Sequence, residues 1–190
     1  MGPLIILSGP SGCGKSTVIQ RLLATSGLPL HLSVSATTRA RRPDEKEGVH
    51  YFFWTRERFE EARARGELLE WAEVHGNCYG TLRSEVEGNR RQGKGVLLDI
   101  DVQGAAQVRQ RCPDIAVSIF MAPPSLEVLR QRLERRGTED ESTIQRRLAA
   151  AQAEMARQGE YDHVVINDDL DRAVAEVVAL VRQSFFRNEE

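Results

Sequence analysis

Short apolar runs alternate with amphipathic segments along most of the chain. Leu4–Ser8, Gly95–Asp101 and Ile115–Met121 are nearly uninterrupted apolar runs, which is the pattern of parallel strands buried on both faces. Segments in which apolar residues recur every three or four positions come between these runs, as in helices with one buried face. Alternating strands and helices predict an α/β fold with a parallel sheet covered by helices.

The same patterns place the remaining elements. Helices are expected over Lys15–Ala24, Glu57–Arg65, Leu82–Gln92, Gln103–Arg111, Ser142–Arg157 and Leu170–Phe186, and another begins at Ser125 as its N-cap. Further strands are expected over Leu30–Ser35, Tyr51–Trp54, Leu68–Val74 and Val164–Asn167. The alternation breaks between about residues 36 and 90, where we expect an inserted lobe.

Length, composition and charge fit one globular domain. The chain has 190 residues, and about 150 residues per domain is usual. Lys and Arg number 26 against 28 Asp and Glu, a net charge of −2 that argues against a general binder of nucleic acid or membrane surfaces. The three cysteines lack the spacing of a zinc site or a disulfide framework, and no targeting or membrane-spanning segment is visible. We therefore expect a cytoplasmic protein.

The first apolar run leads into a glycine-rich loop with the form of a phosphate-binding motif. Residues 9–16 read GPSGCGKS and match G-x-x-x-x-G-K-[ST]. Its glycines let backbone N–H groups turn toward phosphate oxygens, Lys15 supplies a cation for them, and Ser16 supplies a hydroxyl for Mg²⁺. A glycine-rich turn with a chance lysine is the alternative, but the strand before the loop and the helix after it favour the binding of a nucleoside triphosphate. The expected ATP-binding residues here are Gly9, Pro10, Ser11, Gly12, Cys13, Gly14, Lys15, Ser16 and Thr17.

Asp99 and Asp101 stand at the end of an apolar run, two positions apart. This spacing predicts that both carboxylates share one face of a strand, at the sheet edge where ligands bind in open α/β sheets. They can serve Mg²⁺ and its water shell or contact a nucleotide hydroxyl, or they are solvated acids at a strand end. We take Asp99 with Ser16 as the metal candidates, although the pattern alone does not separate the two aspartates.

A basic loop follows the expected second strand. Arg39, Arg41 and Arg42 lie within four positions and repel one another unless an anion lies between them. Arginine also suits the bidentate binding of phosphate. A solvated basic loop explains the segment equally well when it is taken alone.

Nine motifs in order, spanning about residues 3–186, give the chain a close resemblance to the guanylate kinase family of ATP:GMP phosphotransferases. They are the phosphate-binding loop, SATTRxxR at Ser35–Arg42, GxxYxF at Gly48–Phe53, Leu69–Ala72, Asn77–Thr81, Leu98–Gly104, Ala122–Ser125, Arg136–Thr138 and Val165–Asp169. The resemblance implies a P-loop core of about residues 1–35, 91–125 and 158–190, an inserted GMP-binding lobe over about 36–90, and a helical lid over about 126–157. It also implies transfer of the γ-phosphoryl group of ATP to GMP, in purine nucleotide metabolism.

The resemblance carries over specific roles. It implies that Arg39, Arg42, Tyr51 and Tyr79 hold the GMP phosphate, that Ser35, Glu70 and Thr81 contact the guanine, and that Asp99 and Asp101 belong to the GMP site. It implies lid arginines at Arg132, Arg136 and Arg147, catalytic together with Lys15, and places Asn167 near the adenine of ATP. A carboxylate at position 70 suits guanine, because it accepts both N1–H and N2–H, a donor pair that adenine lacks. Threonine at position 81 keeps the hydroxyl of the serine frequent in relatives.

Two other functions are compatible with parts of this pattern. Guanylate-kinase-like modules of scaffold proteins bind phosphorylated peptides without catalysis, but they typically lack the ATP site that is complete here. A P-loop kinase for another small phosphorylated substrate is disfavoured by Glu70 together with Thr81. The expected partners are ATP and GMP with Mg²⁺, without nucleic acid or membrane, and the sequence leaves the oligomeric state open.

Overall fold

The computed structural model describes residues 1–74, 76–135 and 140–186. Its strands are β1 (Leu4–Ser8), β2 (Leu30–Leu32), β3 (Ser35–Thr37), β4 (Phe52–Phe53), β5 (Leu68–Val74), β6 (Asn77–Leu82), β7 (Gly95–Asp99), β8 (Ile115–Ala122) and β9 (His163–Ile166). Its α-helices are α1 (Lys15–Thr25), α2 (Arg56–Ala64), α3 (Arg83–Arg91), α4 (Val102–Arg111), α5 (Leu126–Arg135), α6 (Glu141–Met155) and α7 (Leu170–Phe186). None of these helices is long and apolar enough to cross a membrane.

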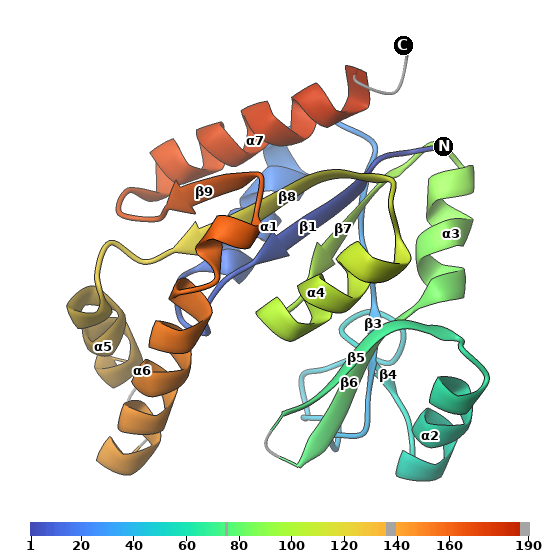
Figure 1. Cartoon of the computed structure of the whole chain (residues 1–190), viewed down its shortest axis with the longest axis horizontal. Coiled ribbons are helices and arrows are strands. Elements are labelled where there is room, and N and C mark those ends of the chain that lie inside the picture. The colour runs from blue at the N-terminus through green and yellow to red at the C-terminus, as the bar shows by residue number, and fades with distance from the viewer. Residues whose placement is uncertain (75, 136–139, 187–190) are drawn as a thin grey trace.

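The centre of the molecule is a five-stranded parallel sheet in the order β2-β7-β1-β8-β9 (Figure 1). Side chains of β1 alternate between its two faces. Ile5 and Leu7 pack with α1 and α7, while Leu4 and Ile6 pack with α3 and α4. This confirms the predicted α/β architecture, because a strand that reads as apolar throughout is covered by helices on both sides.

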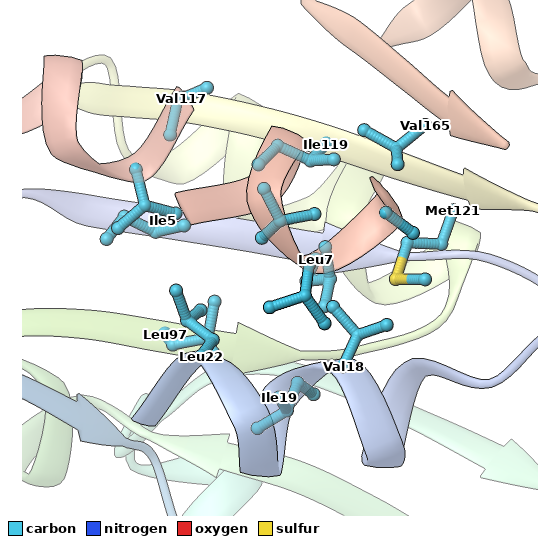
Figure 2. Close-up of a cluster of buried hydrophobic side chains, with 14 of the residues drawn as sticks. Ile5, Leu7, Val18, Ile19, Leu22, Leu97, Val117, Ile119, Met121 and Val165 are labelled. Atoms are coloured by element: carbon cyan, nitrogen blue, oxygen red, sulfur yellow. The ribbon is translucent and has the colours of Figure 1, made fainter. Parts of the chain in front are cut away.

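Figure 2 shows the larger of the two core clusters, between the sheet and helices α1 and α7. Val18, Ile19 and Leu22 of α1 recur at helical spacing and belong to one buried cluster with Ile5 and Leu7 of β1. Each such side chain contributes roughly 1.5–3 kcal/mol when it is fully buried. This packing fixes the strand before the glycine-rich loop and the helix after it, and so fixes the loop itself.

A separate four-stranded mixed sheet, ordered β4-β3-β6-β5, forms the inserted lobe. Its own apolar cluster includes Phe59 and Ala62 of α2. One prediction was wrong in detail here, and one strand was missed. The single strand expected over Leu30–Ser35 is two strands in different sheets, and Asn77–Leu82 is a strand that its mixed polar and glycine-containing sequence did not indicate. Both errors arise because neighbouring strands, rather than local pattern, decide pairing.

Helices α5 and α6 form a pair that lies apart from the lobe sheet (Figure 1). The pair begins at Ser125, whose Oγ accepts a hydrogen bond from the Val128 N–H at 3.1 Å, as expected for an N-cap. Leu129, Leu133 and Ile144 pack in a small cluster of their own. The pair is therefore held together by contacts that are largely separate from the central core.

Candidate active site

Two adjoining cavities lie beyond the carboxyl ends of the parallel strands. The first, the P-loop cavity, has a volume of about 390 Å³, and the second, the lobe cavity, about 310 Å³. The P-loop cavity is lined by Ser11, Gly12, Gly14, Lys15, Ser16, Thr17 and Glu154 in addition to the shared residues. The lobe cavity is lined by Ser35, Glu70, Ala72, Tyr79 and Gly80 in addition to the shared residues. The shared wall consists of Tyr51, Val74, Asp99, Ile100 and Asp101.

The glycine-rich loop follows β1 and leads directly into α1. Its backbone needs glycine at two closely packed points. A Cβ on Gly9 would lie 2.1 Å from the Met121 carbonyl oxygen, and a Cβ on Gly14, with φ of 100°, would lie 2.3 Å from Nδ2 of Asn167. The loop can therefore press against the neighbouring strands, and glycine at these points lets its backbone turn N–H groups toward a ligand.

Lys15 lies at the start of α1 and folds back over this loop. Its Nζ donates to the carbonyl oxygens of Gly9 at 2.6 Å and Pro10 at 3.4 Å. Ser16 and Thr17 follow on the cavity wall. The cation, the helix N-terminus and the loop therefore face one space, which favours an anion.

Arg132 and Asn167 hold the loop from outside its cavity. The Asn167 Nδ2 donates to the Cys13 carbonyl oxygen at 2.7 Å. Arg132 donates to the same oxygen at 3.2 Å and to the Asn167 carbonyl at 2.8 Å. Neither residue is among those that line the P-loop cavity. Both therefore support the loop's shape in this conformation, in addition to any contact with a ligand.

Helix α6 reaches the same cavity with two side chains of opposite charge. Arg147 donates to Ser11 Oγ at 3.3 Å, and Glu154 lines the cavity about two helical turns later. Burial raises the pKa of Glu154, and the Lys15 charge opposes that shift. Sequence reasoning missed Glu154, although its spacing from Arg147 puts both on one helix face. Arg136 lies outside the described residues.

Asp99 and Asp101 both line the shared wall, but they do not share a strand face. Strand β7 ends at Asp99, and Asp101 is the N-cap of α4, where its Oδ1 accepts the Gly104 N–H at 2.7 Å. The expectation of one strand face was wrong because the chain turns into the helix between them. Burial raises the pKa of Asp99, against the influence of Lys15.

Glu70 is the most deeply buried acid of the lobe cavity, with 5% of its surface exposed. Burial raises its pKa to about 7, whereas the hydrogen bond from Thr81 lowers it. The Thr81 Oγ1 donates to Glu70 Oε1 at 2.6 Å. Strand register explains the grouping, because Thr81 lies opposite Ser35 on one side and Glu70 on the other. Three strands thus bring together the three predicted base-contacting residues.

The opposite side of the lobe cavity is aromatic and basic. The rings of Tyr51 and Tyr79 meet edge to face with centroids 5.9 Å apart, and the Arg39 guanidinium lies 5.6 Å from the Tyr51 centroid. Arg39 also forms a bidentate salt bridge with Glu45, with N–O distances of 2.6 and 3.1 Å. The Glu45 carboxylate accepts a further hydrogen bond from the Arg42 backbone N–H at 2.9 Å. These contacts lower the pKa of Glu45 to about 2. The anion expected between the arginines is thus a carboxylate of the chain, which the sequence analysis missed.

The P-loop cavity also offers oxygen ligands of the kind that Mg²⁺ prefers. Ser16 and Asp99 both line it. Among the residues that the structure describes, no group of three or more His, Cys, Asp or Glu can hold a metal ion by itself. Mg²⁺ usually binds through one or two protein oxygens together with substrate phosphates, so this donor set fits it.

Comparison with known proteins agrees with this geometry. The family model described as guanylate kinase matches residues 1–184. The chain belongs to the guanylate kinase family. A guanylate kinase of Chelativorans sp. is 52% identical over 99% of this chain and 86% of its own length, and one of Parasynechococcus marenigrum is 52% identical over 95% and 98%. The crystal structure of guanylate kinase from Anaplasma phagocytophilum covers 96% of this chain and 85% of its own, at 38% identity and a TM-score of 0.77. The mixed β3–β6 sheet is therefore the GMP-binding lobe of a guanylate kinase fold.

Proposed function

We propose that the P-loop cavity of this guanylate kinase binds ATP and that the lobe cavity binds GMP. The enzyme phosphorylates GMP with ATP, so a donor and an acceptor must meet. One observation carries the assignment of the sites. The two cavities share the wall formed by Tyr51, Val74 and residues 99–101, while the phosphate-binding loop lies in one and the Glu70–Thr81 pair in the other.

On the donor side, the loop N–H groups and the N-terminus of α1 bind the ATP phosphates. Lys15 leaves the carbonyl oxygens of Gly9 and Pro10 and pairs with the β- and γ-phosphates, where a mobile cation neutralises developing charge. Asn167 lies at the carboxyl end of β9 and contacts the adenine from the outer side of the loop.

Ser16 and Asp99 hold Mg²⁺ together with the phosphates of ATP. When bound, the ion withdraws charge from the transferred phosphoryl group. Asp99 lies on the solvent-accessible wall of the cavity, and desolvation raises its pKa while the Lys15 charge lowers it, so a further cation beside it favours the ionised carboxylate. Asp101 gives one oxygen to the start of α4, which leaves Asp99 better suited to the ion.

On the acceptor side, Glu70 accepts the N1–H and N2–H of guanine, while Ser35 and Thr81 contact the base through their hydroxyls. The GMP phosphate lies toward Tyr51 and Tyr79, where Arg39 and Arg42 bind it. In this conformation the Arg39 guanidinium binds the Glu45 carboxylate, which supports its role in binding an oxyanion such as the GMP phosphate. The phosphate replaces or joins this carboxylate.

The reaction follows from this placement. An oxygen of the GMP phosphate attacks the γ-phosphorus in line, the bond from that phosphorus to the β-phosphate oxygen breaks, and ADP and GDP result. The nucleophile is already an anion, so the protein mainly orients the groups and offsets charge. Arg147 lies on α6, where a movement of the α5–α6 pair brings it over the phosphates and excludes water. We assign Arg132 and Arg136 to the same lid.

We also propose the boundaries and setting of the enzyme. The GMP-binding lobe spans about residues 36–90 and the lid about 126–157, both carried by one P-loop core. The three cysteines are free, which supports a reducing compartment and hence the cytoplasm.

Turnover with different acceptors tests the proposal. We expect ADP release with GMP to exceed that with AMP, CMP and UMP, and we expect Glu70→Ala to remove most of the preference for GMP over AMP. Glu73→Ala is the matched control, because Glu73 lies on the same strand but is exposed and paired with Arg56. Equal turnover of all acceptors, or unchanged selectivity in Glu70→Ala, would contradict the assignment.

Peptide binding without turnover, as in the scaffold modules, is tested by the same assay. Those modules typically lack an ATP site, whereas here Lys15 and Ser16 line the P-loop cavity and Arg147 contacts Ser11 of the loop. A kinase for another small phosphorylated acceptor would leave the buried Glu70–Thr81 pair without a base to contact. Both alternatives predict that GMP does not stimulate ADP release.

A further inference from the structure

Helix α4 covers the outer edge of the strand that carries Glu70. Strand β5 is the last strand of the lobe sheet, and such an edge exposes N–H and C=O groups. The Gln107 side chain pairs with both backbone groups of Trp71: its Nε2 donates to the carbonyl at 2.6 Å, and its Oε1 accepts the N–H at 3.2 Å. Arg111 donates to the Leu69 carbonyl at 2.8 Å. Side chains of α4 thus take the place of a neighbouring strand.

The covered edge contains an irregularity directly before Glu70. Leu68 lies opposite Leu82, but Glu70 lies opposite Thr81, so Leu69 is an extra residue in the β5–β6 pairing. Such a bulge redirects the side chains around it and leaves backbone groups unpaired. Leu68 packs into the lobe cluster and Leu69 into the core, while Glu70 lines the lobe cavity. The bulge therefore determines that Glu70 faces the cavity.

The backbone of α4 also forms a wall behind the Glu70 carboxylate. A Cβ added at Gly104 would lie 2.5 Å from Glu70 Oε2 and 3.1 Å from its Cδ. The carboxylate cannot simply move aside, because Thr81 holds its Oε1. Asp101 caps the helix at the Gly104 N–H and so fixes the position of this wall.

The positive charge of Arg111 favours the ionised form of the Glu70 carboxylate. Burial raises the pKa of Glu70 to about 7, and Arg111 opposes the shift. An ionised carboxylate can accept two hydrogen bonds from a base, so a nearby cation favours the form that recognises guanine.

We propose that Gly104, Gln107 and Arg111, here called the α4 contact face, position Glu70 and thereby set the selectivity for guanine. The three residues lie on one side of α4. None of them lines the lobe cavity, so they act through Glu70 and the Leu69 bulge rather than by touching the nucleotide. This inference rests on the proposed role of Glu70 as the acceptor for the guanine N1–H and N2–H.

Two substitutions with matched controls test it. Gly104→Ala adds a methyl group against the carboxylate, whereas Gly88→Ala makes the same change in α3 with no atom near the new Cβ. Gln107→Leu removes both bonds to Trp71, whereas Gln110→Leu makes the same change at an exposed position of α4. Each variant is assayed for kcat and KM with GMP and with AMP, for KM of ATP, and for Tm.

We expect Gly104→Ala and Gln107→Leu to lower the GMP-to-AMP ratio of kcat/KM by roughly ten- to hundredfold, the effect of losing a hydrogen bond to a charged group. The loss lies mainly in KM for GMP, while KM for ATP and both control variants stay near the starting protein. Gly104→Ala added to Glu70→Ala lowers the ratio no further, because both act through one carboxylate.

Each of the following outcomes would overturn the inference. An equal loss of turnover with GMP and with AMP would mean that the α4 contact face has only a structural role. An unchanged GMP-to-AMP ratio of kcat/KM in both Gly104→Ala and Gln107→Leu would mean that it has no role in selectivity. If Glu70→Ala keeps the guanine preference, the proposed function of Glu70 fails first and the inference with it. If only Glu70→Ala loses the preference, the inference alone is wrong. Gln107→Leu adds no bulk beside Glu70, so it decides the matter even if Gly104→Ala does not fold.

Discussion

At the scale of single residues, the site depends on charged groups that are removed from water to different degrees, Glu70 the most. Glu70 and Asp99 are carboxylates whose pKa is raised by burial, and Lys15 faces the P-loop cavity with Asp99. Buried charges are costly unless they find partners. Substrate and its cation can supply such partners, so these residues contribute more to binding than to the stability of the free protein.

Lys15→Ala should abolish turnover while the protein stays folded. The Lys15 ammonium donates to the carbonyl oxygens of Gly9 and Pro10 and takes no part in an apolar cluster of the described residues, so its loss costs little packing, whereas phosphoryl transfer loses its mobile cation. ADP formation and Tm measured on the same preparation check this expectation. Near-normal activity would remove Lys15 from the mechanism.

The pH dependence of GMP use should follow the ionisation of Glu70. Its pKa of about 7 in the free protein means that the carboxylate is protonated below that pH and cannot accept both guanine donors. We therefore expect kcat/KM for GMP to rise with pH and to level off above about 7. The GMP phosphate titrates near pH 6 in any case. In Glu70→Gln, kcat/KM for GMP should still change with the ionisation of the GMP phosphate near pH 6 but should lose the change near pH 7. Identical pH profiles of the variant and the starting protein would exclude Glu70 as the origin of the change near pH 7.

At the scale of elements, charge is carried to the phosphates by segments that can move separately. The loop after β3 carries Arg39 and Arg42, while α6 carries Arg147. The first belongs to the lobe and the second to a helix pair with its own small cluster. Substitutions of arginines on different elements should therefore affect different kinetic constants.

Arg42→Lys should mainly raise KM for GMP, because an ammonium cannot reproduce the two-pronged contact to the acceptor phosphate. Arg147→Ala should mainly lower kcat, because this guanidinium meets the transferred group only after the helix pair closes; such arginines are worth about 10³–10⁵ in rate. Steady-state kinetics with GMP varied at saturating Mg-ATP separate the two effects. Arg146→Ala, whose side chain bonds to Thr143 on the exposed face, is the control for the helix. An effect of Arg147→Ala on KM alone would place this residue in the acceptor site.

At the scale of the whole molecule, three bodies meet at the two cavities. The parallel sheet has apolar clusters on both faces, whereas the lobe and the α5–α6 pair each depend on a smaller cluster. Small clusters bury less apolar surface and open at lower free energy. The arrangement provides a rigid phosphate-binding core with two parts that can adjust to substrate.

Hydrogen exchange should report this division. We expect amides of β1, β7 and β8 to exchange slowest and those of α5 and α6 to exchange much faster. The unreactive pair ADP and GMP should slow exchange in the lobe, through the proposed GMP site, and in the helix pair, through the proposed contact of Arg147 with the phosphates. ADP alone serves as the control for the helix pair. Equal protection of core and helix pair in the free protein would contradict the division.

Much of this protein is determined by local sequence. The apolar runs of β1 and β8, the first five residues of the run predicted over Gly95–Asp101, the helical spacing in α1 and the glycine-rich loop between β1 and α1 all follow from interactions among near neighbours, which is why they were predicted correctly. Only the tertiary structure decided which distant residues meet. The pairing of β6 between β3 and β5, the Glu45 carboxylate in the Arg39 fork, Glu154 on the cavity wall and the contact of α4 with the edge of β5 depend on segments far apart in the chain. Such contacts arise because unpaired backbone groups and buried charges must find partners once the core packs, and no pattern of near neighbours records which partners those are.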